Sequence, residues 1–258
     1  PETMVDTGNG LYRMHGSNMK DWSYGGRGGF GLIDVKTVME QSSNIGVSRL
    51  IDEHYGSNPT KFVDGLKRVG AGIDLDTPFP GSQNPRMKRP GDDTWSKTTL
   101  AWMSIGYESL LPPISTCAFY NGIANDGKMI RPYLVTRILN KDEVVEEFHT
   151  EVLKSSMCSR GTLEDIRLAL HDVVWDDRLG TASVSPWGQK KAQSDLVAIA
   201  GKTGTAQLFH HGHYHNREHR MTFVGYFPEE NPKYTCLCMI EHPQAPYDAG
   251  MDCGYVVR

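Results

Sequence analysis

The chain has 258 residues, of which 38% are hydrophobic, so it is long enough to bury a substantial core within one domain. Its 27 basic and 31 acidic residues are nearly balanced, which argues against nucleic-acid binding, because that function shows clustered lysine and arginine. No apolar run approaches the roughly 18 residues that span a bilayer, and the first residues do not form a signal peptide.

The metal-binding residue types do not form a recognisable site. The five cysteines are an odd number without Cys-x-x-Cys spacing, which indicates neither a disulfide framework nor a zinc site. Imidazole binds zinc and copper, and the sequence holds a run of histidines at His210, His211, His213, His215 and His219. No cysteine supports this run, so we interpret it as a solvated loop between two strands and expect neither a metal nor a cofactor.

The first third of the chain begins with polar, glycine-rich pieces and continues as helix. Residues 1–31 predict loops and short extended segments. Ser17 and Lys20 have the spacing Ser-x-x-Lys, but the glycines around them oppose the helix that would place both side chains on one face. Residues 34–55 carry an apolar stripe typical of a helix, with Ser42 and Asn44 inside it at a possible break between two shorter helices.

The middle of the chain predicts further helices and one strand. A helix is expected to begin at Pro59 and continue through Lys67, and a surface excursion to follow over residues 77–95. Apolar residues 98–106 lead to a buried helix over 114–125, which Asp126 and Gly127 end. Residues 131–139 alternate as a strand, and a helix capped by Thr162 extends through Val174.

The last third predicts a sheet. Residues 197–208, 221–227 and 233–241 have the pattern of three successive strands, and an antiparallel meander is the simplest way to connect them. Asn231 and Pro232 supply the second turn.

The first of these strands contains Lys202, Thr203, Gly204 and Thr205. Gly204 has no side chain to hold an extended ligand away from the backbone, and Lys202 adds a positive charge. Thr203 and Thr205 are two residues apart, so their hydroxyls lie on the same strand face. This edge suits a peptide-like substrate that ends in a carboxylate.

A second motif strengthens this interpretation. Ser42 and Asn44 form a Ser-x-Asn triplet, a hydroxyl and an amide that suit the same cleft. Ser-x-x-Lys, Ser-x-Asn and Lys-Thr-Gly together are the signature of serine acyl-enzymes that react with penicillin, and two of the three occur here in the right order.

At these residues the chain resembles the transpeptidase domain of a class B penicillin-binding protein, most closely the septal, cell-division type. Stretches that carry the resemblance lie at 41–50, 103–107, 120–132, 201–207 and 223–228. The resemblance implies an α/β three-layer sandwich with an antiparallel central sheet, in which residues 1–258 are a partial domain. The upstream nucleophile segment and the C-terminal helix are expected to be missing.

The resemblance also implies a reaction. A serine attacks the penultimate D-Ala carbonyl of a peptidoglycan stem peptide, D-Ala leaves, and the acyl group passes to an amine, while β-lactams stall the acyl-enzyme. Ser42 would relay a proton to the leaving group, Asn44 would hold the substrate amide, and Lys202 would support the relay. Thr203 and Thr205 would bind the carboxylate beside Gly204, and the backbone N–H of Thr205 would contribute to the oxyanion hole.

Some implications concern the longer protein. The nucleophile and its base are expected upstream of Pro1, so the chain by itself is predicted to be inactive. The longer protein would lie on the periplasmic face of the inner membrane, anchored by an N-terminal helix and associated with other cell-division membrane proteins. Glu108 departs from the family, which commonly has glycine there, and this departure leaves the local loop geometry uncertain.

Two other functions stay open from the sequence. A β-lactamase or D,D-carboxypeptidase shares these motifs but needs a positioned water for deacylation, and no glutamate matches that role. A non-catalytic penicillin sensor or scaffold is the other, and an upstream Ser-x-x-Lys would argue against it.

Overall fold

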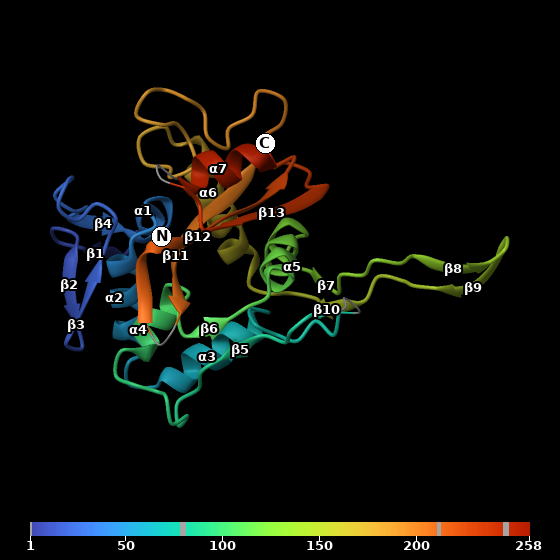
Figure 1. Cartoon of the computed structure of the whole chain (residues 1–258), viewed down its shortest axis with the longest axis horizontal. Coiled ribbons are helices and arrows are strands. Elements are labelled where there is room, and N and C mark those ends of the chain that lie inside the picture. Colours follow the sequence, from blue (N-terminus) through green and yellow to red (C-terminus); the bar gives the residue numbers. More distant parts are fainter. Residues whose placement is uncertain (1, 78–80, 211–212, 245–247) are drawn as a thin grey trace.

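The computed structural model describes residues 2–77, 81–210, 213–244 and 248–258. Its largest sheet has three antiparallel strands, β11 (Ala200–His210), β12 (His213–Phe227) and β13 (Tyr234–Glu241), in that order (Figure 1). Thr203 pairs with Phe223, and Phe223 pairs with Cys238. The predicted antiparallel meander is therefore confirmed.

Helices cover both faces of this sheet. Met221 and Phe223 of β12 point to one face, where they form a buried cluster with Cys253 and Val257 of α7 (Ala249–Val257). Tyr226 points to the other face, where it packs with residues of α5 (Pro113–Ala124) and α6 (Arg160–Trp175). Successive residues of a strand face opposite sides of the sheet, so β12 contributes side chains to the buried clusters on both faces. The three-layer arrangement is thus confirmed.

Helix α7 corrects one expectation and the start of α6 another. The sequence predicted no C-terminal helix, whereas residues 249–257 form one because the Asp248 side chain accepts hydrogen bonds from the N–H groups of Gly250 and Met251. The cap of α6 is Ser159 and not Thr162, since the Ser159 hydroxyl accepts from the Thr162 N–H.

The predicted helix over residues 34–55 is two helices, α1 (Val35–Glu40) and α2 (Asn44–Tyr55). Ser43 caps α2 and thereby fixes the break. Helix α3 (Pro59–Arg68) begins at its proline as expected, and α4 (Thr99–Ser104) packs against α2.

The first 34 residues form two small antiparallel pairs. Strand β1 (Met4–Asp6) pairs with β4 (Leu32–Asp34), and β2 (Leu11–Met14) pairs with β3 (Ser17–Lys20). Met14 and Met19 of the second pair are buried against Ile45 of α2. These strands therefore support the start of α2.

The predicted strand over residues 131–139 is wrong in its bounds. Strand β7 (Met129–Ile130) ends before Pro132 and pairs with β10 (Val152–Lys154), while β8 (Arg137–Asn140) pairs with β9 (Glu143–Glu147). Pro132 has no N–H to donate to a ladder, which disfavours one continuous strand through this position. In the surface excursion, β5 (Arg86–Met87) pairs with β6 (Ser109–Leu110), and residues 78–80 lie outside the described residues.

Part of the histidine run forms strand, whereas a loop was expected. His210 pairs with His213, so strands β11 and β12 extend into it, while His211 lies outside the described residues. Among the described residues, no group of three or more potential ligands is close enough to hold a metal ion. No helix in the described ranges is long and apolar enough to cross a membrane.

Candidate active site

Ser42 lies in the turn that joins α1 to α2. Its φ of 53° is in the left-handed region. This conformation is unfavourable for any residue other than glycine, so contacts with the surrounding structure must offset its cost in free energy. Its N–H donates to the Met39 carbonyl at 3.2 Å. The indole Nε1 of Trp22 donates to the Gln41 carbonyl at 2.7 Å, and Gln41 Nε2 donates to the Leu179 carbonyl, also at 2.7 Å. The serine hydroxyl is thus presented by a turn fixed from two sides.

The buried carboxylate of Asp21 holds the residues that follow. It accepts from the Ser43 hydroxyl at 2.8 Å and from the Ile45 N–H at 3.0 Å. Burial raises the pKa of Asp21, while these hydrogen bonds oppose the rise. The amide of Asn44 donates to the Lys20 carbonyl at 2.9 Å. Together these contacts attach the beginning of α2 to the end of β3.

Lys202 reaches Ser42 from the sheet. Its Nζ donates to the Ser42 hydroxyl and to the carbonyl of Thr203, the latter at 3.1 Å. The two side chains are 160 residues apart in the sequence. Burial lowers the pKa of Lys202 to about 8, because a desolvated ammonium is less stable than a neutral amine. The expected meeting of the Lys-Thr-Gly strand with the Ser-x-Asn segment is therefore present.

The rest of the Lys-Thr-Gly strand forms an open rim. The Thr203 hydroxyl shares a hydrogen bond of 2.8 Å with the hydroxyl of Thr181. Gly204 and Thr205 are exposed. A Cβ placed on Gly204 would meet only Thr222, at an ordinary 3.8 Å, so the space in front of this residue is free for a ligand.

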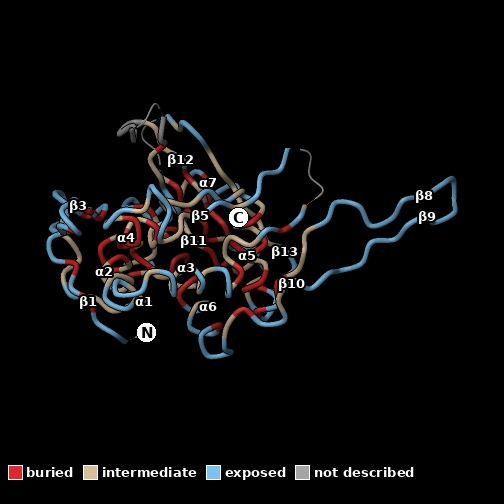
Figure 2. Tube along the Cα trace, turned by 90° about the horizontal axis from the view of Figure 1, so that it is seen from below, coloured by how far each residue is buried: buried red, intermediate tan, exposed pale blue. Residues whose placement is uncertain are grey.

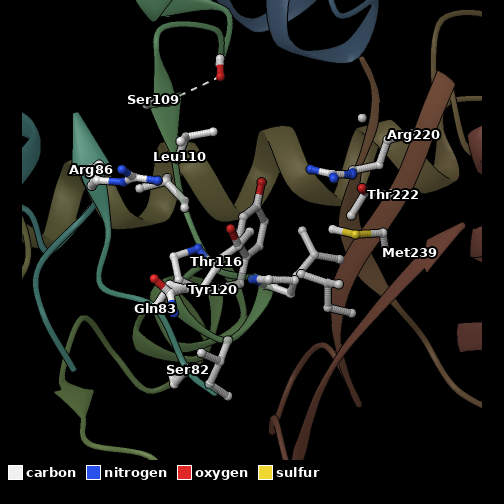
Figure 3. Close-up of a pocket in the computed structure, with 18 of the residues that line it drawn as sticks. Ser82, Gln83, Arg86, Ser109, Leu110, Thr116, Tyr120, Arg220, Thr222 and Met239 are labelled. Atoms are coloured by element: carbon white, nitrogen blue, oxygen red, sulfur yellow. Dashed lines mark hydrogen bonds between the residues drawn. The ribbon is translucent and has the colours of Figure 1, made fainter. Parts of the chain in front are cut away.

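A cavity of about 860 Å³ lies between the sheet, α5 and the 106–114 segment. Lys202 and Gly204 line it from β11, and Tyr120 lines it from α5. Figure 3 shows Tyr120 in the middle, with Arg86 on one side and Arg220 on the other. Burial raises the pKa of Tyr120 to about 12, so its phenol stays protonated at neutral pH. The cavity is cationic along its rim and has the size of a ligand pocket.

Two sequence candidates are placed apart from Lys202. Among the described residues, Asn44 makes no hydrogen bond with Ser42 or Lys202, since its amide is directed to Lys20. Ser17 is an exposed residue of β3 and pairs with Met14. Side chains three apart on a strand point to opposite faces, so the Ser17-x-x-Lys20 sequence does not form a nucleophile and base pair.

Comparison with known proteins identifies the family. Residues 1–253 match the family described as the penicillin binding protein transpeptidase domain. The chain belongs to this family. Within it, the relatives place the chain with the class B transpeptidase domains. The pairing of Lys202 with Ser42 therefore lies within a domain of the penicillin-binding protein family.

Individual relatives of the chain are also penicillin-binding proteins or probable transpeptidases by name. The chain is 28% identical to penicillin-binding protein PbpB of Mycolicibacterium smegmatis over 93% of its own length and 35% of the relative's. It is 30% identical to the probable peptidoglycan D,D-transpeptidase PbpC of Pseudomonas aeruginosa over 82% of its own length and 33% of the relative's. The chain therefore spans about a third of the length of these curated relatives.

Solved structures show the same fold. The apo transpeptidase domain of Burkholderia pseudomallei penicillin-binding protein 3 has a TM-score of 0.75 at 26% identity, covering 99% of this chain and 69% of that one. Penicillin-binding protein 3 of Mycobacterium tuberculosis, solved in complex with ampicillin, also has a TM-score of 0.75 at 26% identity. That alignment covers 94% of this chain and 51% of the other.

Glu108, the departure from the penicillin-binding protein pattern, has a φ of 61°. Glycine adopts this left-handed conformation freely, which explains why glycine suits the position. Here the carboxylate of Glu108 forms an ion pair with Lys88, and the Lys88 N–H donates to the Glu108 carbonyl at 3.3 Å. The loop at Glu108 is therefore held by an ion pair and a backbone hydrogen bond, both with Lys88.

Sequence reasoning missed several residues that build this site. Thr181 precedes Thr203 by 22 residues, and no sequence pattern indicates the hydrogen bond between their hydroxyls. Asp21 and Gln41 act through distant partners, so their roles depend on the tertiary structure alone. Tyr120 lies in a helix predicted correctly, although which of its residues face the cavity was not predicted.

Proposed function

We propose that this chain is the substrate-binding part of a peptidoglycan D,D-transpeptidase that works through a serine acyl-enzyme and is inhibited by β-lactams. The contact between Lys202 Nζ and the Ser42 hydroxyl carries the proposal, because a proton relay through this contact would lie beside the ligand-sized cavity that Lys202 lines. The substrate is a stem peptide that ends in D-Ala-D-Ala.

The strand edge binds the substrate terminus. Thr203 and Thr205 hydroxyls hold the terminal carboxylate, and the positive charge of Lys202 supports them. The peptide backbone lies along the open front of Gly204. The Thr205 N–H, together with the N–H of the nucleophile, stabilises the oxyanion, where one donor contributes roughly 3 kcal/mol in other enzymes.

Proton transfer runs through Ser42. The nucleophilic serine gives its proton to its own base and attacks the penultimate D-Ala carbonyl, and collapse of the tetrahedral intermediate expels the D-Ala amine. Ser42 donates its proton to that amine and is reprotonated through Lys202, whose pKa of about 8 suits both donating and accepting near neutral pH. The acyl group then passes to an amine of another stem peptide. Asn44 reaches the substrate amide only after leaving the Lys20 carbonyl.

The nucleophile and its base lie outside these 258 residues in this proposal. Ser17 is the sequence's one serine with a lysine three residues later, and it is an exposed residue of β3. The proposed longer protein carries a helical Ser-x-x-Lys upstream, with an N-terminal membrane anchor that places the domain on the periplasmic side and next to other cell-division proteins.

A hydrolytic function has less support. None of the described residues that line the cavity is an aspartate or glutamate, so no carboxylate is placed to activate a deacylating water. A β-lactamase or carboxypeptidase would need such a base.

Labelling with fluorescent penicillin tests the proposal. The longer protein is expected to form a stable covalent adduct, and the 258-residue chain none. In the longer protein, Ser42→Ala and Lys202→Ala should each slow acylation by about 10² to 10⁴-fold, the usual contribution of positioned proton transfer. Covalent labelling of the short chain would overturn the placement of the nucleophile. Turnover of penicillin by the longer protein would favour a hydrolase, and the absence of any adduct would favour a non-catalytic module.

A further inference from the structure

The β8–β9 hairpin projects from the body of the molecule and is separate from the proposed active site (Figure 1). Every residue from 133 to 151 is exposed, and Figure 2 shows the whole arm in the colour of exposed residues. An isolated two-stranded hairpin is at best marginally stable in water. Binding of another polypeptide to this arm would therefore stabilise it.

The hairpin is rich in apolar side chains despite its exposure. Leu139 is 57% exposed and Val145 is 64% exposed, near the tip. The large apolar residues exposed along the arm are Leu134, Val135, Ile138, Leu139, Val144, Val145 and Phe148. Exposed apolar side chains gathered in one segment mark interaction sites in soluble proteins.

The charges on the two strands differ. Arg137 of β8 pairs with Glu147 of β9 at 3.6 Å. Within the described residues, Asp142, Glu143 and Glu146 have no ion-pair partner. Among the described residues, no strand pairs with the edge of β9 that faces away from β8, and three of the five residues of β9 are glutamates.

We propose that the free edge of β9 binds an extended segment of another protein, which adds a third strand to the hairpin. Alternation along β9 places Glu143 and Val145 on one face and Val144 and Glu146 on the other, so each face is part acidic and part apolar. The complementary segment therefore carries basic residues opposite Glu143, Glu146 and Glu147 and apolar residues opposite Val144 and Val145. Main-chain hydrogen bonds supply affinity, and the charges select the partner and its register.

The same charges oppose the other possible occupants. Antiparallel pairing of β9 with β9 of a second copy around Val145 places Glu143 opposite Glu147, and like charges directly opposite destabilise a ladder. A bilayer surface carries anionic lipids, which repel Asp142, Glu143 and Glu146. An extended basic segment of a different protein is the occupant that the charge pattern favours.

A defined peptide tests the proposal. We expect a fluorescein-labelled peptide of about ten residues that contains Lys-Lys-Val-Val-Lys to bind the chain in fluorescence anisotropy, more weakly as salt is added. Glu143→Lys/Glu146→Lys should weaken binding by about tenfold or more, and amides of residues 143–147 should gain protection from hydrogen exchange on binding. The matched control is Glu164→Lys/Asp165→Lys, the same charge change on the exposed side of α6.

Two further probes separate strand addition from charge attraction alone. The same peptide N-methylated at alternate residues keeps its side chains but loses the N–H groups for the ladder, and its binding should be lost. Equal binding of that peptide, or equal weakening in the control variant, overturns the proposal. Hairpin-dependent dimers in analytical ultracentrifugation, or hairpin-dependent binding to vesicles of phosphatidylglycerol and phosphatidylethanolamine, would assign the arm to a second copy or to a membrane and also overturn it.

Discussion

Lys202 and Gly204 show how individual residues shape the rim of the candidate site. Lys202 is buried where its Nζ contacts the Ser42 hydroxyl. Burial disfavours the charged ammonium and thereby lowers the pKa of Lys202. Gly204, two residues further, leaves the front of the strand open, whereas Gly201 on the same strand is enclosed. Each residue leads to a prediction that separates its role in the site from its role in the fold.

The lowered pKa of Lys202 predicts a pH dependence of stability. The amine has an ordinary pKa of 10.5 when unfolded and about 8 when folded. Between these values the unfolded chain binds more protons, so the free energy of unfolding contributed by this group rises with pH, by on the order of 1 to 3 kcal/mol over the window. Below pH 8 the contribution does not change. Urea unfolding of the wild type and Lys202→Met across pH 7 to 10.5 measures the difference, and parallel profiles would contradict the pKa.

Gly201 and Gly204 form a matched pair. A Cβ on Gly201 would lie 2.6 Å from Phe223 Cζ and 2.6 Å from the Val224 carbonyl oxygen, so Gly201→Ala should lower the free energy of unfolding by about 1 to 3 kcal/mol. Gly204→Ala should change it by less than about 0.5 kcal/mol but slow penicillin acylation of the longer protein. Urea unfolding and acylation kinetics give the two readings. Equal loss of stability in both variants would show that Gly204 is structural.

At the scale of elements, the joint between β3 and α2 positions Ser42. The buried Asp21 carboxylate accepts the hydrogen bonds of the Ser43 hydroxyl and of N–H groups at the start of α2, which would otherwise need water as their acceptor. Asp21→Ala leaves these donors buried without an acceptor, so we expect a loss of about 2 to 3 kcal/mol in the free energy of unfolding. Ser43→Ala removes one donor and leaves the carboxylate its backbone partners, so it should cost about 1 kcal/mol. Thermal unfolding of both variants tests the order, which would be reversed if Ser43 were the main support.

Most elements followed from local sequence, and the exceptions have physical causes. Apolar periodicity and a start at Pro59 were sufficient to predict α3. Alternation of residues along the strands was sufficient to predict β11, β12 and β13. The strand predicted over 131–139 was wrong because the pattern was weighed above the missing N–H of Pro132. The bonds of Gln41 to Leu179 and of Thr181 to Thr203 join distant segments, so no local pattern predicts them.

At the scale of the whole molecule, the body and the β8–β9 hairpin are expected to be independent in stability. The base of the arm is held by Arg131, whose Nε lies 2.7 Å from Glu151 Oε2, while residues 133–151 are exposed throughout. Replacing residues 135–148 with a short glycine linker should therefore shift the melting temperature by less than about 2 °C. Calorimetry measures the shift. A large loss would mean that the arm packs on the body in solution.

Protease accessibility gives a second reading of the same independence. A glutamate-specific protease is expected to cut first at residues 143–147, because exposed segments with few tertiary contacts open most often. Mass spectrometry of early digests identifies the site. First cleavage elsewhere among the described residues would show that another segment is less protected.

The pairing of Lys202 with Ser42 across 160 residues has a consequence for how the protein is made. A ribosome releases the Ser42 turn before the Lys202 amine that faces it, so the proposed penicillin-binding rim forms only after β11 has been made. Prematurely terminated chains that stop before β11 keep the serine turn and still lack the opposite wall. Under the proposed function such products bind no penicillin whatever helices they retain, and the assembled rim marks a chain that has folded through β11.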